Sequence, residues 1–313
     1  QSGYDLRFPP ISWALASVPE GATARGSNTL LFPEGTGPGS NDNINAGKNR
    51  ARISWYQIEP TLQQYKGPNN PFSNNAVELS DPRVRQVYQR EIFLQRTTGF
   101  GESLLTTFDM AYYPTDKGPY NYDDAAITPN GKLLNPKTRW GGLMRSIDQP
   151  DFETANIEFI EFWLQDPFID YAPRIPNASS STGGKLYFNL GNISEDILKD
   201  GQRFYENGLP TPNAPAPVGN SNWGRVPINP VQVTNAFSND PNDRKYQDIG
   251  FDGLDDTAEA TKRSVYLAQI AANFGTGSQA YQQASADPSA DNYHYYRGDD
   301  YDQQGLGILS RYK

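Results

Sequence analysis

The chain has 313 residues, a net charge of −9, a sequence pI of about 4.8 and a mean hydropathy of −0.71. It contains no cysteine and one histidine, which excludes disulfides and cysteine metal sites and argues against a histidine-dependent triad. The acidic balance argues against nucleic-acid binding, and no apolar run of about 18 residues is present that would span a membrane as a helix.

Four parts of the chain differ in composition. We expect a loop-rich β region with one short helix over 1–125 and a central β-sandwich segment over 126–208. A Pro/Asn-rich linker or loop follows over 209–232, and 233–313 combines an acidic loop, a helix and a Tyr-rich C-terminal segment. The sequence starts at Gln1 without a signal peptide, so we expect it to be a piece of a longer protein.

Several short elements are predicted in the first part. Side chains alternate between two faces along 50–58 and 104–113, which is typical of strands. The sequence Ser80-Asp81-Pro82 places a capping residue before a proline, and this signal predicts a short helix to about Gln89. Shorter strands are expected at 12–18 and 30–32.

The segment 139–190 is the part richest in aromatic and β-branched residues. In 157–164, apolar residues occur at both odd and even positions, as in a strand that is covered on both faces. A helix is the competing interpretation. Residues 186–190 alternate cleanly between apolar and polar. Together these two segments predict a mainly β fold, a jelly-roll-like β-sandwich with short helices and long loops.

Acidic residues mark the last part of the chain. Asp248, Asp252, Asp256 and Glu259 occupy positions 1, 5, 9 and 12 of a loop with glycine at position 6, which resembles an EF-hand calcium loop. Position 3 is Gly250, which offers no side-chain oxygen. The alternative is structural: Asp255 or Asp256 caps a following helix over about 258–273, which ends at Gly275, and Glu259 favours its positive end. A second short helix is expected after the capping-box spacing of 192–195.

Other candidate sites carry less weight. Glu158 and Glu161 lie three residues apart and point to opposite faces of a strand, so they do not flank one glycosidic bond. His294 between two tyrosines is a candidate general base, but a packing role is the commoner one for such a residue. The pair Gly141-Gly142 lacks the helix that a phosphate-binding loop needs.

Long runs of sequence resemble the SprA/Sov family. The matching runs are RWGGLMRS at 139–146, DFE at 151–153, NIEFIEFW at 156–163, LYFNLGNISED at 186–196, YYP at 112–114, GPYNY at 118–122, DIGFDGLDD at 248–256 and DNYHY at 291–295. They are spread over most of the chain from Asp81 onward, while the first fifty residues match less well. This resemblance is specific because the runs are long.

The resemblance implies a function in protein export. The family forms the outer-membrane translocon of the type IX secretion system of Bacteroidetes, which is linked to gliding motility and to the export of proteases and adhesins. Its members are very long chains that build a transmembrane β-barrel with large soluble insertions. This chain lacks serial lipid-facing strands of about ten residues. The resemblance therefore implies a soluble insertion or cap at the cell surface or periplasmic face of the outer membrane.

The family offers no catalytic motif, so we expect a non-enzymatic module. Its expected partners are other type IX secretion components, secreted cargo proteins and the rest of its own parent chain. One alternative is a carbohydrate-binding β-sandwich module of a secreted or cell-surface protein, in which aromatic, Asn- and Asp-rich loops would contact sugars. A third interpretation, a secreted adhesin domain stabilised by calcium, depends on 248–259.

Overall fold

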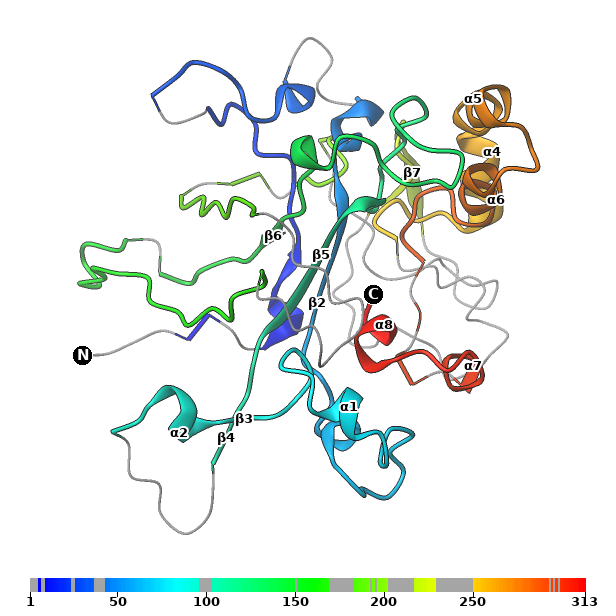
Figure 1. Ribbon diagram of the computed structural model, residues 1–313. Coiled ribbons are helices and arrows are strands. Elements are labelled where there is room, and N and C mark those ends of the chain that lie inside the picture. Colours follow the sequence, from blue (N-terminus) through cyan, green and yellow to red (C-terminus); the bar gives the residue numbers. More distant parts are fainter. Residues whose placement is uncertain are drawn as a thin grey trace.

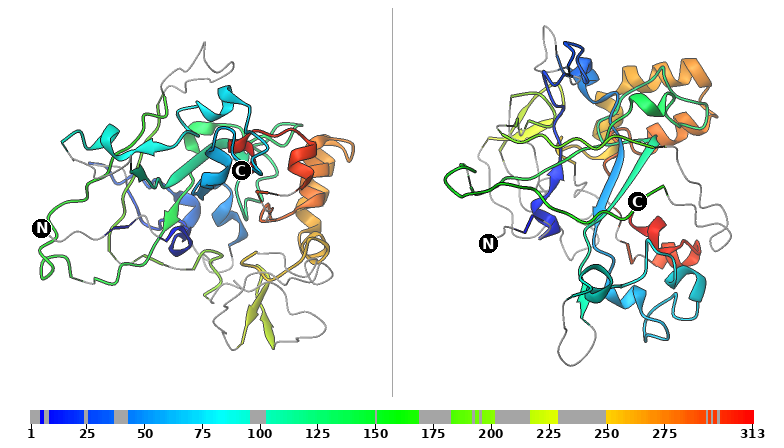
Figure 2. Two further views of the ribbon diagram at one scale, coloured as in Figure 1. Left: turned by 90° about the horizontal axis from the view of Figure 1, so that it is seen from below. Right: turned by 60° about the vertical axis from the view of Figure 1, so that its left-hand side comes forward.

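The computed structural model describes the following residues: 5–6, 9–23, 26–36, 43–95, 103–149, 151–168, 183–191, 193–194, 196–201, 217–228, 250–292, 294, 296–297 and 299–313. An antiparallel pair of strands runs through the middle of the molecule (Figure 1). Helices α4, α5 and α6 lie on one side of this pair, and the segment that follows β6 extends on the other side, as the views of Figure 2 also show.

The central pair joins β2 (Ala51–Tyr56) to β5 (Asp109–Lys117). Tyr56 lies opposite Asp109 and Arg52 opposite Tyr113, but the register shifts between Ala51 and Arg52. β2 lies inside the segment 50–58, so that prediction is confirmed. The strand predicted over 104–113 is confirmed only from Asp109 onward, because Leu104–Leu105 belong to a separate strand and β5 continues to Lys117. Residues 114–116 of β5 have no partner in β2 at this shift, so the pairing of the two strands is interrupted there.

The remaining strands are short, and every sheet in the described part of the chain has two strands. The other antiparallel pairs are β1 (Ala14–Leu15) with β6 (Leu143–Met144), β3 (Val87–Tyr88) with β4 (Leu104–Leu105), and β7 (Val218–Asn220) with β8 (Arg225–Pro227). The β7–β8 hairpin lies inside the segment 209–232 that composition marks as a linker or loop. Its turn carries Trp223, which is buried.

Short helical turns also occur along the chain outside these strands. They are η1 (Pro10–Ser12), η2 (Pro33–Gly35), η3 (Ile44–Gly47), η4 (Pro60–Gln63), η5 (Pro136–Thr138), α1 (Ala76–Leu79), α2 (Gln89–Ile92), α7 (Asp299–Gln303) and α8 (Ile308–Arg311). The helix predicted from Ser80-Asp81-Pro82 is wrong. The Asp81 carboxylate instead accepts from the backbone and guanidinium of Arg83, which closes a single turn before β3.

The longest helices follow the acidic loop. They are α4 (Asp256–Lys262), α5 (Ser264–Phe274) and α6 (Gln279–Ala286). The single helix predicted over 258–273 is therefore two helices, which separate at Arg263, where φ is −98° and ψ is 22°. The predicted end is confirmed, because Gly275 adopts a φ of +82° that favours glycine. The short helix predicted after residue 195 is not present among the described residues 196–201.

The main core is aromatic and lies between α5, α6 and the loop that follows β5. Tyr120, Tyr122 and Trp223 are buried together, and Ile270 of α5 is fully buried against this cluster. Tyr120 and Tyr122 each lie 6.5 Å or less from Trp223 between ring centroids. Aromatic side chains bury large areas, so a few of them form a core here without a large sheet.

A second core joins the C-terminus to the segment after β2. Ile308 of α8 is fully buried among apolar side chains that include Leu62 and Val84. The Tyr312 ring stacks on Tyr56 at 4.5 Å, and its hydroxyl accepts a hydrogen bond from the Glu59 amide at 3.0 Å. The last residues of the chain therefore complete a core that the first hundred residues begin.

The predicted jelly-roll-like sandwich is wrong for the described part of the chain. Residues 157–164 and 186–190 form no strand there, and their large apolar side chains are exposed. Their composition indicates burial on both faces, but no described segment supplies a neighbouring strand or an opposite sheet. Among the described residues, no helix combines the length and the apolar character needed to cross a bilayer.

Candidate functional site

The predicted metal ligands lie where the loop before α4 meets the first turn of that helix. Asp248 lies outside the described residues. Asp252 is in the loop, whereas Asp256 and Glu259 belong to α4. Asp252 and Glu259 are both fully buried, and Asp256 is partly buried.

Two glycines shape the loop that presents Asp252. At Gly250 an added Cβ would lie 2.2 Å from a carboxylate oxygen of Asp291, so only glycine allows this close approach. Gly253 has a φ of +66°, which bends the chain directly after Asp252. The Asp252 Oδ1 then accepts a hydrogen bond from the amide of Leu254 at 3.0 Å, which fixes its carboxylate toward the interior.

The first turn of α4 places Glu259. The side chain of Asp255 accepts from the amide of Ala258 at 2.8 Å and so caps the helix, as the structural alternative predicts. Glu259 lies in this first turn, where a negative charge interacts favourably with the helix dipole. Capping accounts for Asp255 alone, since it does not explain why Glu259 is buried beside Asp252.

A turn after α6 supplies the other side of the site. The Ser289 amide donates to Glu259 Oε2 at 3.0 Å, and the Ser289 hydroxyl donates to Asp252 Oδ2 at 3.2 Å. Asp291 follows in the same turn, and its Oδ2 accepts from the Tyr120 hydroxyl at 2.6 Å. The site therefore joins segments that are more than 30 residues apart in the sequence.

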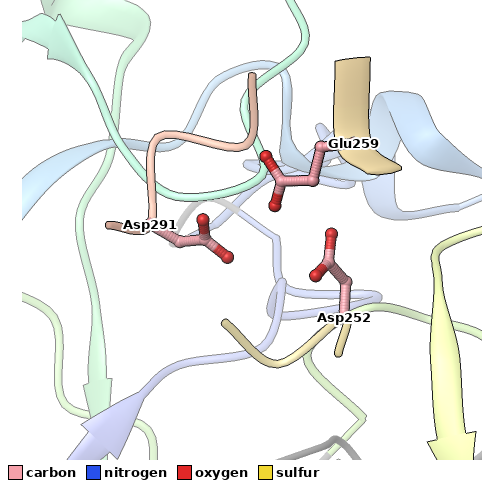
Figure 3. Close-up of side chains that lie close together, drawn as sticks. All are labelled: Asp252, Glu259 and Asp291. Carbon is pink, nitrogen blue, oxygen red and sulfur yellow. The ribbon is translucent and has the colours of Figure 1, made fainter. Parts of the chain in front are cut away.

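Three carboxylates converge at this point (Figure 3). Asp252, Glu259 and Asp291 each offer an oxygen, and these oxygens all lie within 4.8 Å of one another. A second group of the same compactness contains Asp256, Glu259 and Asp287. Glu259 is shared by both groups, so the predicted set is brought together around Glu259 and not as a single ring.

Burial changes the acid–base properties of the site. Burial raises the pKa of Asp252 to about 6, although the Leu254 amide, the charge of Arg263 and the Ser289 hydroxyl oppose this change. Burial also raises the pKa of Asp256 and of Asp287. The pKa of Tyr120 lies well above its usual value for the same reason, with the charge of Asp291 as a further cause.

The positive charge of Arg263 lowers the pKa of Asp252 and so opposes the effect of burial. Its guanidinium lies 4.6 Å from the centre of the Tyr122 ring, and its Nη1 donates to the carbonyl of Asn222 at 3.0 Å. It also donates to the carbonyl of Trp223. These contacts direct the guanidinium toward an aromatic ring and backbone carbonyls of the core. Its positive charge therefore compensates the negative charge of the buried carboxylates only in part.

This arrangement suits two kinds of chemistry. Buried carboxylates in mutual contact need either a bound cation or a shared proton, because an uncompensated buried charge is costly. Calcium prefers carboxylate and carbonyl oxygens, which this site supplies. The protein's own donors already occupy oxygens of all three carboxylates. Calcium therefore fits the donor chemistry of the site, and calcium binding stays a prediction.

Sequence reasoning missed Asp287, Asp291 and Ser289. Asp291 lies 32 positions after Glu259, so loop spacing does not connect the two. The usable signal was the turn sequence Asp287-Pro288-Ser289-Ala290-Asp291, which has an acidic residue at each end and directly follows a helix.

The other candidate residues lie elsewhere. Glu158 and Glu161 are exposed, far from the acidic site in sequence, and belong to neither carboxylate group. The His294 ring stacks on Tyr301 with 3.9 Å between centroids, as the packing interpretation predicts. Gly141 is packed against Ile53 and Tyr112, where an added Cβ would lie 3.0 Å from either side chain.

One comparison with known proteins links the chain to a family. Residues 265–313 match the family SprA_N, which is described as a motility related/secretion protein. This match supports assignment to the SprA family, in agreement with the resemblance seen in the sequence. No curated protein matches the chain.

Proposed function

We propose that this chain is a non-catalytic cap or insertion segment of an outer-membrane translocon of the type IX secretion system, which acts in protein export and gliding motility. The SprA_N match at 265–313 supports a role in motility and secretion. The finer proposal comes from the sequence resemblance, which extends over most of the chain after residue 81.

The packing of the matched segment is the observation that extends the proposal to the whole chain. Residues 265–313 contribute Ile270 to the main core and Ile308 to the second core. The Ile308 amide donates to a carboxylate oxygen of Glu78 at 2.5 Å, and the Arg297 guanidinium donates to Glu59 at 2.9 Å. The matched segment thus packs into both cores together with earlier parts of the chain. The family match of this segment therefore bears on the function of the rest of the chain.

The absence of cysteine allows a direct test. A single cysteine would replace Val265 or Leu94, and each of these side chains is 83% exposed. The new cysteine would be the only thiol in this chain. Each variant would be expressed within the parent protein in its native cell, and cross-linked during export of a tagged cargo protein. We expect cross-links to cargo or to another secretion component that disappear when export is blocked.

One outcome of the cross-linking experiment would contradict the proposal. If neither position cross-links to cargo or to a secretion component while export proceeds normally, the chain does not take part in translocation. A cysteine replacing buried Ile270 serves as the negative control for labelling, because its side chain is fully buried.

A carbohydrate-binding module is the second candidate function. Its support is the exposure of Trp163 at 67% and of Tyr187 at 48%, since aromatic rings exposed on a surface are the groups that stack on sugars. A rise in melting temperature with soluble glycans would favour this candidate, whereas an unchanged melting curve would remove it.

A further inference from the structure

The apolar surface formed by residues 157–164 and 186–190, here called the aromatic flank, lies on the side of the molecule away from α4, α5 and α6. Its large side chains are strongly exposed, for example Phe159 at 71%, Trp163 at 67% and Leu186 at 58%. The two segments meet, because the rings of Phe162 and Phe188 lie 5.4 Å apart. The aromatic flank is therefore one continuous surface.

Exposure on this scale is unusual for a soluble chain. Isolated apolar side chains on a surface are normal, but contiguous patches mark interaction sites. Every large apolar residue of 157–164 is at least 39% exposed, and removal of this surface from water is favourable. This surface therefore favours binding to something that removes it from water.

The backbone of the aromatic flank is also available for hydrogen bonds to a ligand. Among the described residues, no backbone–backbone hydrogen bond involves the amides of 158–164, and these residues lie outside helices and strands. An extended peptide binds such a segment through main-chain hydrogen bonds, while its alternate side chains contact the apolar surface. This feature favours a polypeptide ligand over a lipid, which cannot pair with the backbone.

Charge specifies the ligand further. Between Arg145 and Arg174 the sequence has seven acidic residues and no lysine or arginine. Glu158 and Glu161 lie within the flank, are exposed, and form no ion pair within the part of the chain that the structure describes. A ligand with lysine or arginine beside its apolar residues complements this charge, whereas a second copy of the chain or an anionic membrane is repelled.

A sugar ligand fits the flank less well. Sugar sites combine aromatic planes with polar groups, but nearly half of the large apolar residues in the flank are aliphatic, including Ile157, Leu164 and Leu186. Aliphatic side chains of this kind pack best against other apolar side chains.

We propose that the aromatic flank is a docking surface for a separate polypeptide segment that carries alternating apolar and basic side chains. Its main chain pairs with residues 158–164, the apolar side chains on one face of the peptide cover Phe159 and Trp163, and the basic side chains on its other face contact Glu158. Glu161 adds to the negative charge of the surface. The proposal rests on the flank itself and does not depend on the role in secretion.

The test uses the purified chain and synthetic peptides. A nine-residue fluorescent peptide of alternating valine and lysine is compared with the same peptide carrying glutamate in place of lysine, by fluorescence anisotropy. We expect the lysine peptide to bind at least about tenfold more tightly, and its binding to weaken as salt increases. Amide exchange should slow within 157–164 when the lysine peptide is bound.

Variants at exposed positions keep the fold intact while they test the contacts. The double variant Phe159→Ser and Trp163→Ser should weaken binding of the lysine peptide at least about tenfold. The matched control is Val265→Ser, which removes an equally exposed apolar side chain outside the flank and should leave binding unchanged. The double variant Glu158→Lys and Glu161→Lys should reverse the preference toward the glutamate peptide.

Four results would overturn the proposal. They are equal binding of both peptides, an undiminished affinity after the Phe159 and Trp163 substitutions, concentration-dependent dimers in sedimentation that the same substitutions abolish, and binding of soluble glycans or of phosphatidylglycerol vesicles in place of the lysine peptide.

Discussion

Replacing Asp252 with asparagine separates a bound cation from a shared proton at the acidic site. The folded pKa of Asp252, about 6, lies above its ordinary value of 3.8. The cost of keeping this carboxylate ionised in the folded state is therefore absent below about pH 4 and complete above about pH 6. A shift of about 2 units corresponds to about 3 kcal/mol at neutral pH.

Without calcium, Asp252→Asn should therefore raise the free energy of unfolding at pH 7 by up to about 3 kcal/mol. The asparagine oxygen keeps the hydrogen bond from the Leu254 amide, and its amide group is a donor beside the Glu259 carboxylate. At pH 4 the difference between variant and wild type should shrink, because the wild-type carboxyl is then protonated in the fold.

With calcium, the stability advantage of the variant should largely disappear. If Asp252, Glu259 and Asp291 hold the ion, calcium at 100 times its Kd stabilises the wild type by about 2.7 kcal/mol, and a chelator removes this gain. The Asp252→Asn variant should show no calcium response. Asp255→Asn is the matched control, because asparagine caps a helix as well as aspartate does and Asp255 belongs to neither carboxylate group.

The assay is thermal and urea unfolding at pH 4 and pH 7, in excess calcium and in chelator. A wild-type melting curve that is the same with and without calcium would remove the metal prediction. Loss of more than about 1 kcal/mol of stability in Asp252→Asn with chelator at pH 7 would contradict the reasoning about the buried charge.

Three further predictions concern stability. Ile308→Ala should lower the free energy of unfolding by about 2–5 kcal/mol in urea, since its fully buried side chain fills the second core; a loss below about 1 kcal/mol would contradict that core. Burial lowers the pKa of Lys117 to about 8, so between about pH 8 and pH 10 the unfolded chain holds its proton more tightly than the native state does. The free energy of unfolding of the wild type, measured relative to that of Lys117→Met, should therefore rise over this pH range. A difference that stays constant with pH would refute the lowered pKa of Lys117. Gly224→Ala should destabilise by about 1–3 kcal/mol because its Cβ would lie 2.0 Å from the carbonyl oxygen of Asp252, whereas Gly277→Ala, with open space around it, should change the melting temperature little.

Local signals in the sequence predicted local structure well. Alternation located β2 and the first part of β5, Asp255 capped α4, and Gly275 ended α5. Each of these features depends on residues close together in the chain. The signal at Ser80-Asp81-Pro82 failed because a turn uses the same residues, and the bonds from Arg83 decide between turn and helix.

Features that depend on contacts between distant segments could not be predicted from the sequence. The composition of 157–164 indicates apolar contacts but not which segment supplies them, so the sandwich prediction was wrong. Asp252 and Glu259 were found because loop spacing links them, whereas Asp291 comes close only through the packing of the turn after α6. The aromatic core of Tyr120 and Trp223 has no periodic pattern, because loops build it.

The central claim is that this chain takes part in protein export. Its most direct test removes residues 151–190 from the parent gene. This deletion spares β6 and Arg139, which donates to the Lys48 carbonyl at 2.7 Å and pairs with Asp123. Export of a folded cargo protein is then measured in cells where the parent protein still reaches the outer membrane. We predict that export is lost, and normal export would contradict the claim.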